Sequence, residues 1–350
     1  MSQRSFALGE CTMKKKRTRR ESFLGDHRGT VLVTIAMLAG GTQAQTDQRQ
    51  TLSGLVDISV GESKPPGGLK TRRVDSGQMT TSWIGFRGNE DLGDGLSAIF
   101  ALESFLRADT GASGRFNGDA FFARNTFVGL TQKGVGTVRL GRNTTPLFVS
   151  TLVFNAFGDS FGYSPSIRHY FLSGTVSGDT GWNDSVLLST QPLGGATINL
   201  IAGAGEGSSG RKWGGNVIWF GGPAAATFAY QDVNKDSLGP NLATRSWQLG
   251  GSYDFGRGKL FAQLGKVDNR TTNNSFDLLG LGAQVTFGQG NLLAQWGGLK
   301  PDIGAKRNTF SVGYDYFISK RTDLYAVAIS DKVKGIASGR GYSLGVRHRF

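Results

Sequence analysis

The 350-residue sequence predicts an all-β fold, a closed antiparallel barrel of about 16 strands. From residue 51 onward, apolar and polar side chains alternate with the period of two that a strand shows when its faces meet different surroundings. Of the 54 glycines only five lie before residue 45, so the rest of the chain is far richer in glycine than the usual roughly 7%. Few segments show the apolar spacing of an amphipathic helix. These three observations favour strands joined by tight turns.

The first 44 residues predict an export signal. A basic run, Lys14 to Arg17, precedes the short apolar segment 31–38, and small residues lead to a cleavage site after Ala44. A start at Met13 gives a signal of more ordinary length, and the alternative is a basic arm followed by a buried helix. The single cysteine, Cys11, lies in this segment, so no disulfide is expected in the barrel domain, residues 45–350.

The strands follow from the alternation. In the segment 246–255, Leu249 and Tyr253 share one face while Gln248 and Gly250 share the other. Sixteen segments show such a pattern: 51–63, 75–92, 95–109, 119–134, 136–148, 179–191, 194–205, 211–220, 223–233, 242–256, 258–270, 275–288, 290–300, 306–319, 321–332 and 339–350. Tight glycine turns alternate with longer polar connections, as in transmembrane barrels with short turns at one rim. The connection 149–178 is too long for an ordinary hairpin and is a candidate functional segment.

Alternation alone also fits a soluble β-sandwich, and the last strand favours the membrane alternative. It ends with Leu344, Val346 and the terminal Phe350 on one face, which in lipid would close the barrel against the first strand. The opposite faces of the strands are rich in small and polar residues, which predicts water inside a barrel of this width. Candidates for the aromatic girdles are Trp83, Trp219, Trp296, Tyr314, Tyr316 and Phe317.

Enzymatic and nucleic-acid functions find little support. The three histidines are His27 in the signal, His348 in the last strand and His169, so a Ser-His-Asp site would depend on His169 alone. No phosphate-binding Gly-Lys-Ser/Thr loop is present, and the basic residues are interspersed with acids. We expect no enzyme activity, no cofactor, no metal and no nucleic-acid partner.

Four motifs resemble the general porins of Gram-negative bacteria, especially the betaproteobacterial type. They are residues 85–104 (GFRGNEDLG and GLSAIFALES around a turn), 124–130 with 136–146 (RNTFVGL and GTVRLGRNTTP), 319–326 (SKRTDLYA) and 345–350 (GVRHRF). The resemblance covers residues 51–350. It implies a homotrimer of 16-stranded barrels in the outer membrane, in contact with its lipid, each with its third long loop folded inward as a pore constriction.

The resemblance also implies the site. Arg87, Arg124 and Arg142 match family positions on the barrel wall near that loop, whereas the alternative is that they are rim arginines holding loops by salt bridges. Arg139 shares a face with Thr137 and Gly141, which favours the lumen. The opposite wall would be supplied by Glu103 and Asp159. Trp83 stands where the family commonly has arginine, and Arg168 with His169 is a candidate replacement.

The function that follows is passive diffusion of small hydrophilic solutes and ions, with a preference for anions because fixed cations would face the narrowest water. One alternative is a solute-specific channel, suggested by the many phenylalanines of the segment 149–178. Another is a structural or adhesive outer-membrane barrel.

Overall fold

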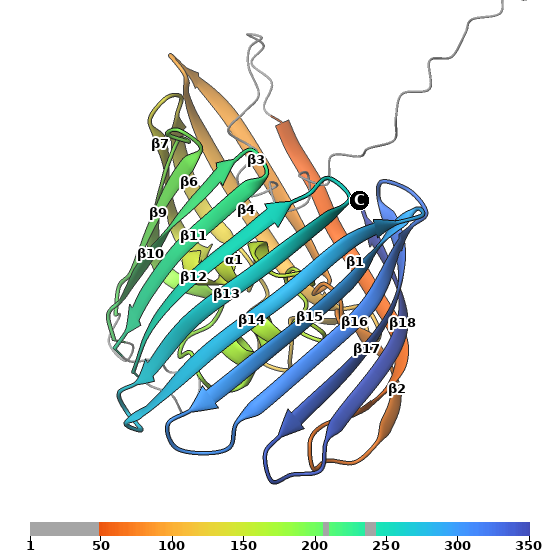
Figure 1. Ribbon diagram of the computed structural model, residues 1–350. Coiled ribbons are helices and arrows are strands. Elements are labelled where there is room, and N and C mark those ends of the chain that lie inside the picture. The colour runs from red at the N-terminus through yellow and green to blue at the C-terminus, as the bar shows by residue number, and fades with distance from the viewer. Residues whose placement is uncertain (1–48, 206–209, 235–242) are drawn as a thin grey trace, which may run out of the picture. The chain divides into compact units, whose positions relative to one another are not determined.

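The alternating segments form an antiparallel sheet that closes on itself (Figure 1). The computed structural model describes residues 49–205, 210–234 and 243–350, so the export signal predicted for residues 1–44 lies outside the described residues. The described strands are β1 (Arg49–Lys64), β2 (Thr71–Ser76), β3 (Trp83–Gly93), β4 (Leu96–Arg107), β5 (Ala112–Ser113), β6 (Thr126–Gln132), β7 (Gly136–Thr144), β8 (Gly181–Thr190), β9 (Ala196–Gly203), β10 (Lys212–Gly221), β11 (Ala224–Val233), β12 (Thr244–Asp254), β13 (Gly258–Asn269), β14 (Asn274–Phe287), β15 (Gly290–Pro301), β16 (Arg307–Phe317), β17 (Thr322–Val333) and β18 (Gly339–Arg349).

Sixteen of these described strands make the wall, because β2 and β5 are short additions at the long-loop rim. Each wall strand pairs with its sequence neighbour, and β18 pairs with β1. The closure is continued by Gly54 and Phe350, whose amides each donate to the carbonyl of the other, at 3.0 and 3.1 Å. The ring of Phe350 lies over Gly54, where a Cβ would clash with it. The predicted barrel of about 16 strands, closed by its last strand, is confirmed.

The two faces of the wall differ as the alternation predicts. On β12, Gln248 is fully buried while the side chain of Leu249 is 47% exposed on the outside. The same holds on β1, where Asp57 is buried inside and Val60 is exposed outside. Apolar side chains on the outer surface and polar side chains within are the arrangement of a barrel that crosses a membrane around water.

Three predicted strands differ from the observed bounds by more than two residues. The segment 75–92 is interrupted, because residues 77–82 turn inward between β2 and β3, where the carboxylate of Asp57 accepts hydrogen bonds from the amides of Met79 and Thr80, both at 2.7 Å. The strand predicted at 119–134 is regular only from Thr126. The strand predicted at 136–148 ends at Thr144, since Thr145 and Pro146 begin a helix.

The helices of the described residues are α1 (Pro146–Val153), α2 (Pro165–Ile167) and η3 (Arg168–Leu172), all in the connection from β7 to β8. Thr145 Oγ1 caps α1 by accepting from the amide of Phe148 at 3.3 Å, and Ser164 Oγ does the same for α2. Within the part of the chain that the structure describes, no helix is long and apolar enough to cross a membrane.

Candidate functional site

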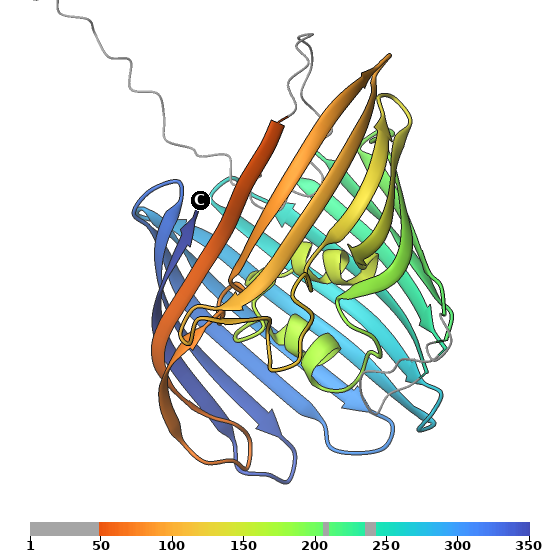
Figure 2. The ribbon, with the colours of Figure 1, turned by 180° about the vertical axis from the view of Figure 1, so that it is seen from behind.

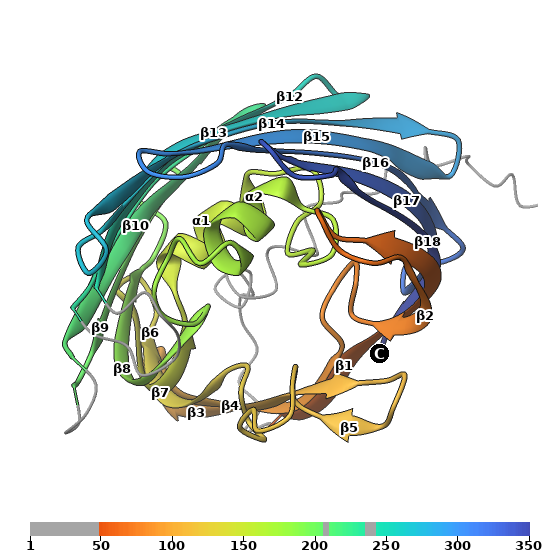
Figure 3. The same cartoon turned by 90° about the horizontal axis from the view of Figure 1, so that it is seen from below.

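The connection from β7 to β8, residues 145–180, folds into the barrel, and we call it the inner loop (Figure 2). Helix α1 packs against β10, β11 and β12, α2 packs against β14, β15 and β16, and η3 packs against β15. Figure 3 shows both α-helices on this side of the barrel, with β3 and β4 across from them. The loop predicted from its length to be functional is therefore the element that narrows the channel.

Glycines on the wall make room for the inner loop. A Cβ at Gly280 would lie 2.8 Å from Ser166 Oγ, and one at Gly297 would lie 2.7 Å from the Cβ of Pro165, both closer than real Cβ contacts. At Gly265 a Cβ would overlap the hydroxyl of Tyr170. We call the set facing the loop from β12 to β15 the glycine bed: Gly250, Gly265, Gly280, Gly282 and Gly297.

Buried amide side chains of the wall bind the loop's backbone and hydroxyls. Asn216 Nδ2 donates to the carbonyl of Pro146 at 2.8 Å, and Gln263 Nε2 donates to the carbonyl of Thr151 at 2.7 Å. Gln295 Nε2 donates to Ser166 Oγ at 2.8 Å. Because polar groups without partners are costly away from water, these bonds favour one position of the loop over others.

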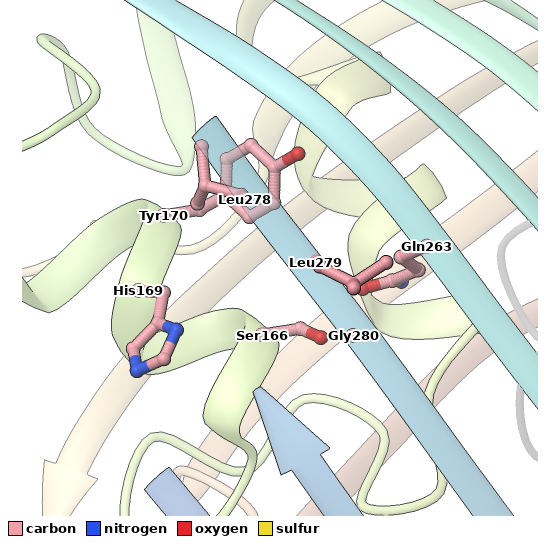
Figure 4. Close-up of a pocket in the computed structure, with 7 residues that line it drawn as sticks. All are labelled: Ser166, His169, Tyr170, Gln263, Leu278, Leu279 and Gly280. Carbon is pink, nitrogen blue, oxygen red and sulfur yellow. The ribbon is translucent and has the colours of Figure 1, made fainter. Parts of the chain in front are cut away.

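Between these contacts, α2 and η3 leave only a cavity of about 10 Å³, at the lower limit for one water molecule (Figure 4). His169 and Tyr170 line it, and His169 Nε2 is 2.9 Å from Thr309 Oγ1. Burial lowers the pKa of His169 to about 3, so this side chain is neutral at neutral pH. His169 is thus a packed residue of the loop and supplies no charge to the channel.

The inward turn at residues 77–82 holds the loop from the other side. The carbonyl of Gln78 accepts from Ser160 Oγ at 2.8 Å and from the amide of Gly162 at 3.0 Å. Thr80 Oγ1 donates to Asp159 Oδ1 at 3.3 Å and accepts from the Arg347 guanidinium at 2.9 Å. The turn therefore fixes the tip of the loop, including Asp159, against β1 and β18.

Arg87 on β3 and Arg124 just before β6 both form ion pairs with Glu103 on β4. The Glu103 carboxylate is fully buried and also accepts from Asn125 Nδ2 at 2.9 Å. The Arg124 guanidinium lies over the Trp83 ring, 4.1 Å from its centroid. Both arginines are partly exposed, so the lumen meets a pair of cations that share one buried carboxylate.

Arg139 on β7 completes this surface, which we call the arginine wall: Arg87, Arg124 and Arg139. Its guanidinium lies 4.8 Å from the centroid of the Phe127 ring, and the charges of Arg87 and Glu103 act on it. Among the described residues Arg139 has no ion pair, and its buried Nε has no hydrogen-bond partner. It is therefore the cation of the wall that no carboxylate neutralises directly.

Arg142 has another role. Its guanidinium donates to the carbonyl of Ala123 at 2.6 Å and to Asn183 Oδ1 at 2.7 Å, and it pairs with Asp179 at the end of the inner loop. Arg115 pairs with the same aspartate. Burial raises the pKa of Asp179, but the two arginines outweigh it and lower the pKa to about 2. Arg142 anchors the end of the loop.

A sequence profile of Gram-negative porins matches residues 30–335. The chain belongs to the Gram-negative porin family. Outer membrane porin protein 32 of Delftia acidovorans is 30% identical over 91% of this chain and 99% of its own length. An outer membrane porin protein of Bordetella pertussis is 26% identical over the same shares. The solved structure of the anion-selective porin from Comamonas acidovorans has a TM-score of 0.75 and 28% identity, over 87% of this chain and all of that one.

The porin is thus an outer-membrane channel, and its structure places the predicted site residues in two groups. Arg87, Arg124 and Arg139 lie together on the arginine wall, whereas Arg142 holds the loop, as the rim-arginine alternative had it. Glu103 was expected on the opposite wall, but it lies between Arg87 and Arg124, because β4 is the neighbour of β3. The inner loop does supply Asp159.

Two further expectations are corrected in the porin. Arg168 donates to the carbonyls of Phe161 and Gly162 within the loop and pairs with Asp331 at 3.4 Å, so, like His169, it does not stand in for an arginine at position 83. Trp83 was a girdle candidate, but it faces the lumen under Arg124. Trp83 and Arg87 are four residues apart on the same strand, so their side chains share one face, and this spacing predicts that Trp83 faces the lumen.

A second group of lumen-side arginines in the porin was not predicted from the sequence. Arg347 on β18 pairs with Asp315 at 2.7 Å and with Asp323 at 2.9 Å, and Arg307 on β16 pairs with Asp331. The alternation of β18, with Leu344 and Val346 outside, places Arg347 inside. Its two aspartate partners lie on other strands, so these ion pairs could not be predicted from the sequence of β18 alone.

Acidification should increase the anion preference of this porin through Asp159. Burial raises the pKa of its carboxyl, against the opposing effect of Arg347 and Arg124, so Asp159 loses its charge at a higher pH than an ordinary aspartate. The neutral form no longer offsets the nearby arginines. We expect the zero-current potential in a fixed KCl gradient to move toward the anion limit as the pH falls.

The matched control is Asp159→Asn, which carries no charge at any pH. The wild type should approach the potential of this variant at low pH and differ from it most at neutral pH. A constant difference between the two proteins across the titration would contradict the role of Asp159.

Proposed function

We propose that this porin conducts small hydrophilic solutes with a preference for anions, and that Arg139 together with Arg87 and Arg124 produces that preference. The observation that carries the proposal is the arginine wall itself. Three guanidinium groups lie on neighbouring segments of the barrel wall, with Glu103 between those of Arg87 and Arg124, and the inner loop supplies Asp159. The local sum of these five formal charges is positive.

The positive net charge of this group affects ion selectivity because it lies where the passage is narrow. In a narrow passage with low-dielectric walls, a few fixed charges set the potential that an ion meets, and screening is weak when the width approaches the Debye length of roughly 8–10 Å. The barrel domain, residues 45–350, has 31 basic and 23 acidic residues, and its formal charge of +8 acts in the same direction. The anion selectivity stated for the Comamonas acidovorans porin supports the proposal, since that protein shares the fold and 28% of the sequence.

Arg139→Gln should shift the zero-current potential in a KCl gradient toward cation preference. This arginine has no carboxylate partner among the described residues, so its removal leaves no buried charge unpaired and the barrel should keep its stability. The matched control is Arg257→Gln, which makes the same change in net charge in an exposed short turn. Planar-bilayer recording of the two variants makes the comparison.

An unchanged potential in Arg139→Gln, or equal shifts in the two variants, would contradict the assignment to the arginine wall. Cation preference in the wild type would overturn the anion preference itself. The absence of conductance steps from folded protein would favour a structural or adhesive barrel.

We propose further that three copies associate through the outer faces of the first strands. Leu52 and Val60 on β1 are 50% and 58% exposed, and the ring of Phe350 lies over Gly54 between them. Unheated electrophoresis in mild detergent should show a species of about three times the monomer mass, which Val60→Arg should weaken because it places a charge in the apolar contact. A monomer under every mild condition would contradict the trimer.

A further inference from the structure

The inner loop presents a strip of aromatic rings that are not fully buried by its attachment to the wall. The ring centroids of Phe148 and Phe161 are 5.9 Å apart in a stacked arrangement, and Phe171 meets Phe148 edge-on at 5.2 Å. All three side chains are only partly buried. We call these three rings the aromatic strip.

The strip lies on the free side of the loop. On α1, the residues Leu147, Ser150 and Thr151 are fully buried against the wall, where Ser150 Oγ is 2.9 Å from Thr227 Oγ1. Phe148, which follows Leu147 on that helix, stays partly exposed. The inner loop lies inside the barrel (Figure 2), so the exposed part of the Phe148 side chain meets the lumen.

Packing of the loop is provided by other phenylalanines. Phe154 is fully buried with Ile218 of β10, and Phe157 is buried with Tyr325 and Met79. Phe171 also touches the cluster around Leu147 and Tyr170, but Phe148 and Phe161 belong to no buried cluster among the described residues. Partly exposed apolar rings in an aqueous passage gain free energy when a solute covers them.

Strand β3, which carries Arg87 of the arginine wall, lies across the lumen from the helices α1 and α2 of the inner loop (Figure 3). That wall is itself partly aromatic, because Trp83 underlies Arg124 at 4.1 Å and Phe127 underlies Arg139 at 4.8 Å. A solute between the two surfaces meets guanidinium groups on one side and flat rings on the other. Inorganic anions use only the first of these surfaces.

We propose that the constriction binds aromatic carboxylates, with the carboxylate on the arginine wall and the ring on the aromatic strip. The proposal rests on the proposed anion-preferring channel and adds the class of solute. Guanidinium groups pair with planar carboxylates through parallel hydrogen bonds, and aromatic pairs contribute beyond the area they bury. A solute with an apolar ring but no charge would contact only the aromatic strip, and a charged solute without a ring would contact only the arginine wall.

The test is block of the chloride current by added carboxylates in planar bilayers, expressed relative to each protein's own chloride conductance. Benzoate should reduce the current of the wild type at a concentration at least about tenfold lower than acetate. Cyclohexanecarboxylate, which has similar bulk but no flat ring, should require more than benzoate. Equal concentrations for benzoate and either of the other two would overturn the proposal.

The double variant Phe148→Leu/Phe161→Leu keeps apolar side chains and removes two rings. It should raise the half-blocking concentration of benzoate about 3- to 10-fold while leaving that of acetate unchanged. The matched control Phe121→Leu, in the exposed loop before β6, should block like the wild type. Unchanged benzoate block in the double variant would overturn the role of the strip.

The outcomes separate this inference from the proposed function. Anion preference in chloride without block by benzoate overturns the aromatic site alone. Cation preference in chloride overturns the channel function on which it rests. If the double variant does not fold, the comparison of the three carboxylates in the wild type decides the proposal.

Discussion

The shape of the channel depends on glycines, which have no side chain, where the inner loop meets the barrel wall. Glycine in a strand weakens it by roughly 0.5–1 kcal/mol relative to alanine, yet five glycines of β12 to β15 face this loop. They let Ser166, Pro165 and Tyr170 approach the backbone of the wall. Added methylenes in such tight contacts typically cost about 1–3 kcal/mol, so a larger residue that is not covalently bonded to the loop would force the loop toward the middle of the channel. The glycine bed therefore sets where the remaining lumen lies, which is beside β3, β4 and β7.

The charges of the lumen follow from that geometry. Most of the buried acids on the described wall strands lie in ion pairs with arginines of neighbouring strands, as Asp323 does with Arg347 and Glu103 does with Arg87. A buried carboxylate without its partner would cost about 3–5 kcal/mol, so these pairs hold both members in place. Arg139 stands outside the pairs, and its charge is left to act on the solution. The anion preference then comes from the arginines whose charges are not offset by a carboxylate of the wall.

Much of this could be predicted from the sequence, because a period of two records which face of each strand meets water. That parity places Arg139 inside and Leu249 outside, and it places Trp83 on the same face as Arg87. The parts that could not be predicted depend on residues far apart in the chain. The inward turn after β2 requires Asp57 from β1, and the anchoring role of Arg142 requires Asp179. The composition shows an excess of glycine, but it does not show which residue of the inner loop packs against each glycine of the glycine bed.

The most direct test of the account is a disulfide between the inner loop and the glycine bed. A Cβ at Gly280 would lie 2.8 Å from Ser166 Oγ, close to the about 3 Å that a disulfide of normal geometry sets between one Cβ and the far sulfur. The chain has one cysteine, Cys11, in the predicted export signal, so Ser166→Cys/Gly280→Cys adds a unique pair to the barrel. We predict that the bond forms on mild oxidation and leaves the unit conductance and the ion preference unchanged. Failure of the pair to cross-link in the folded barrel, or a channel that closes or widens when it does, would contradict it.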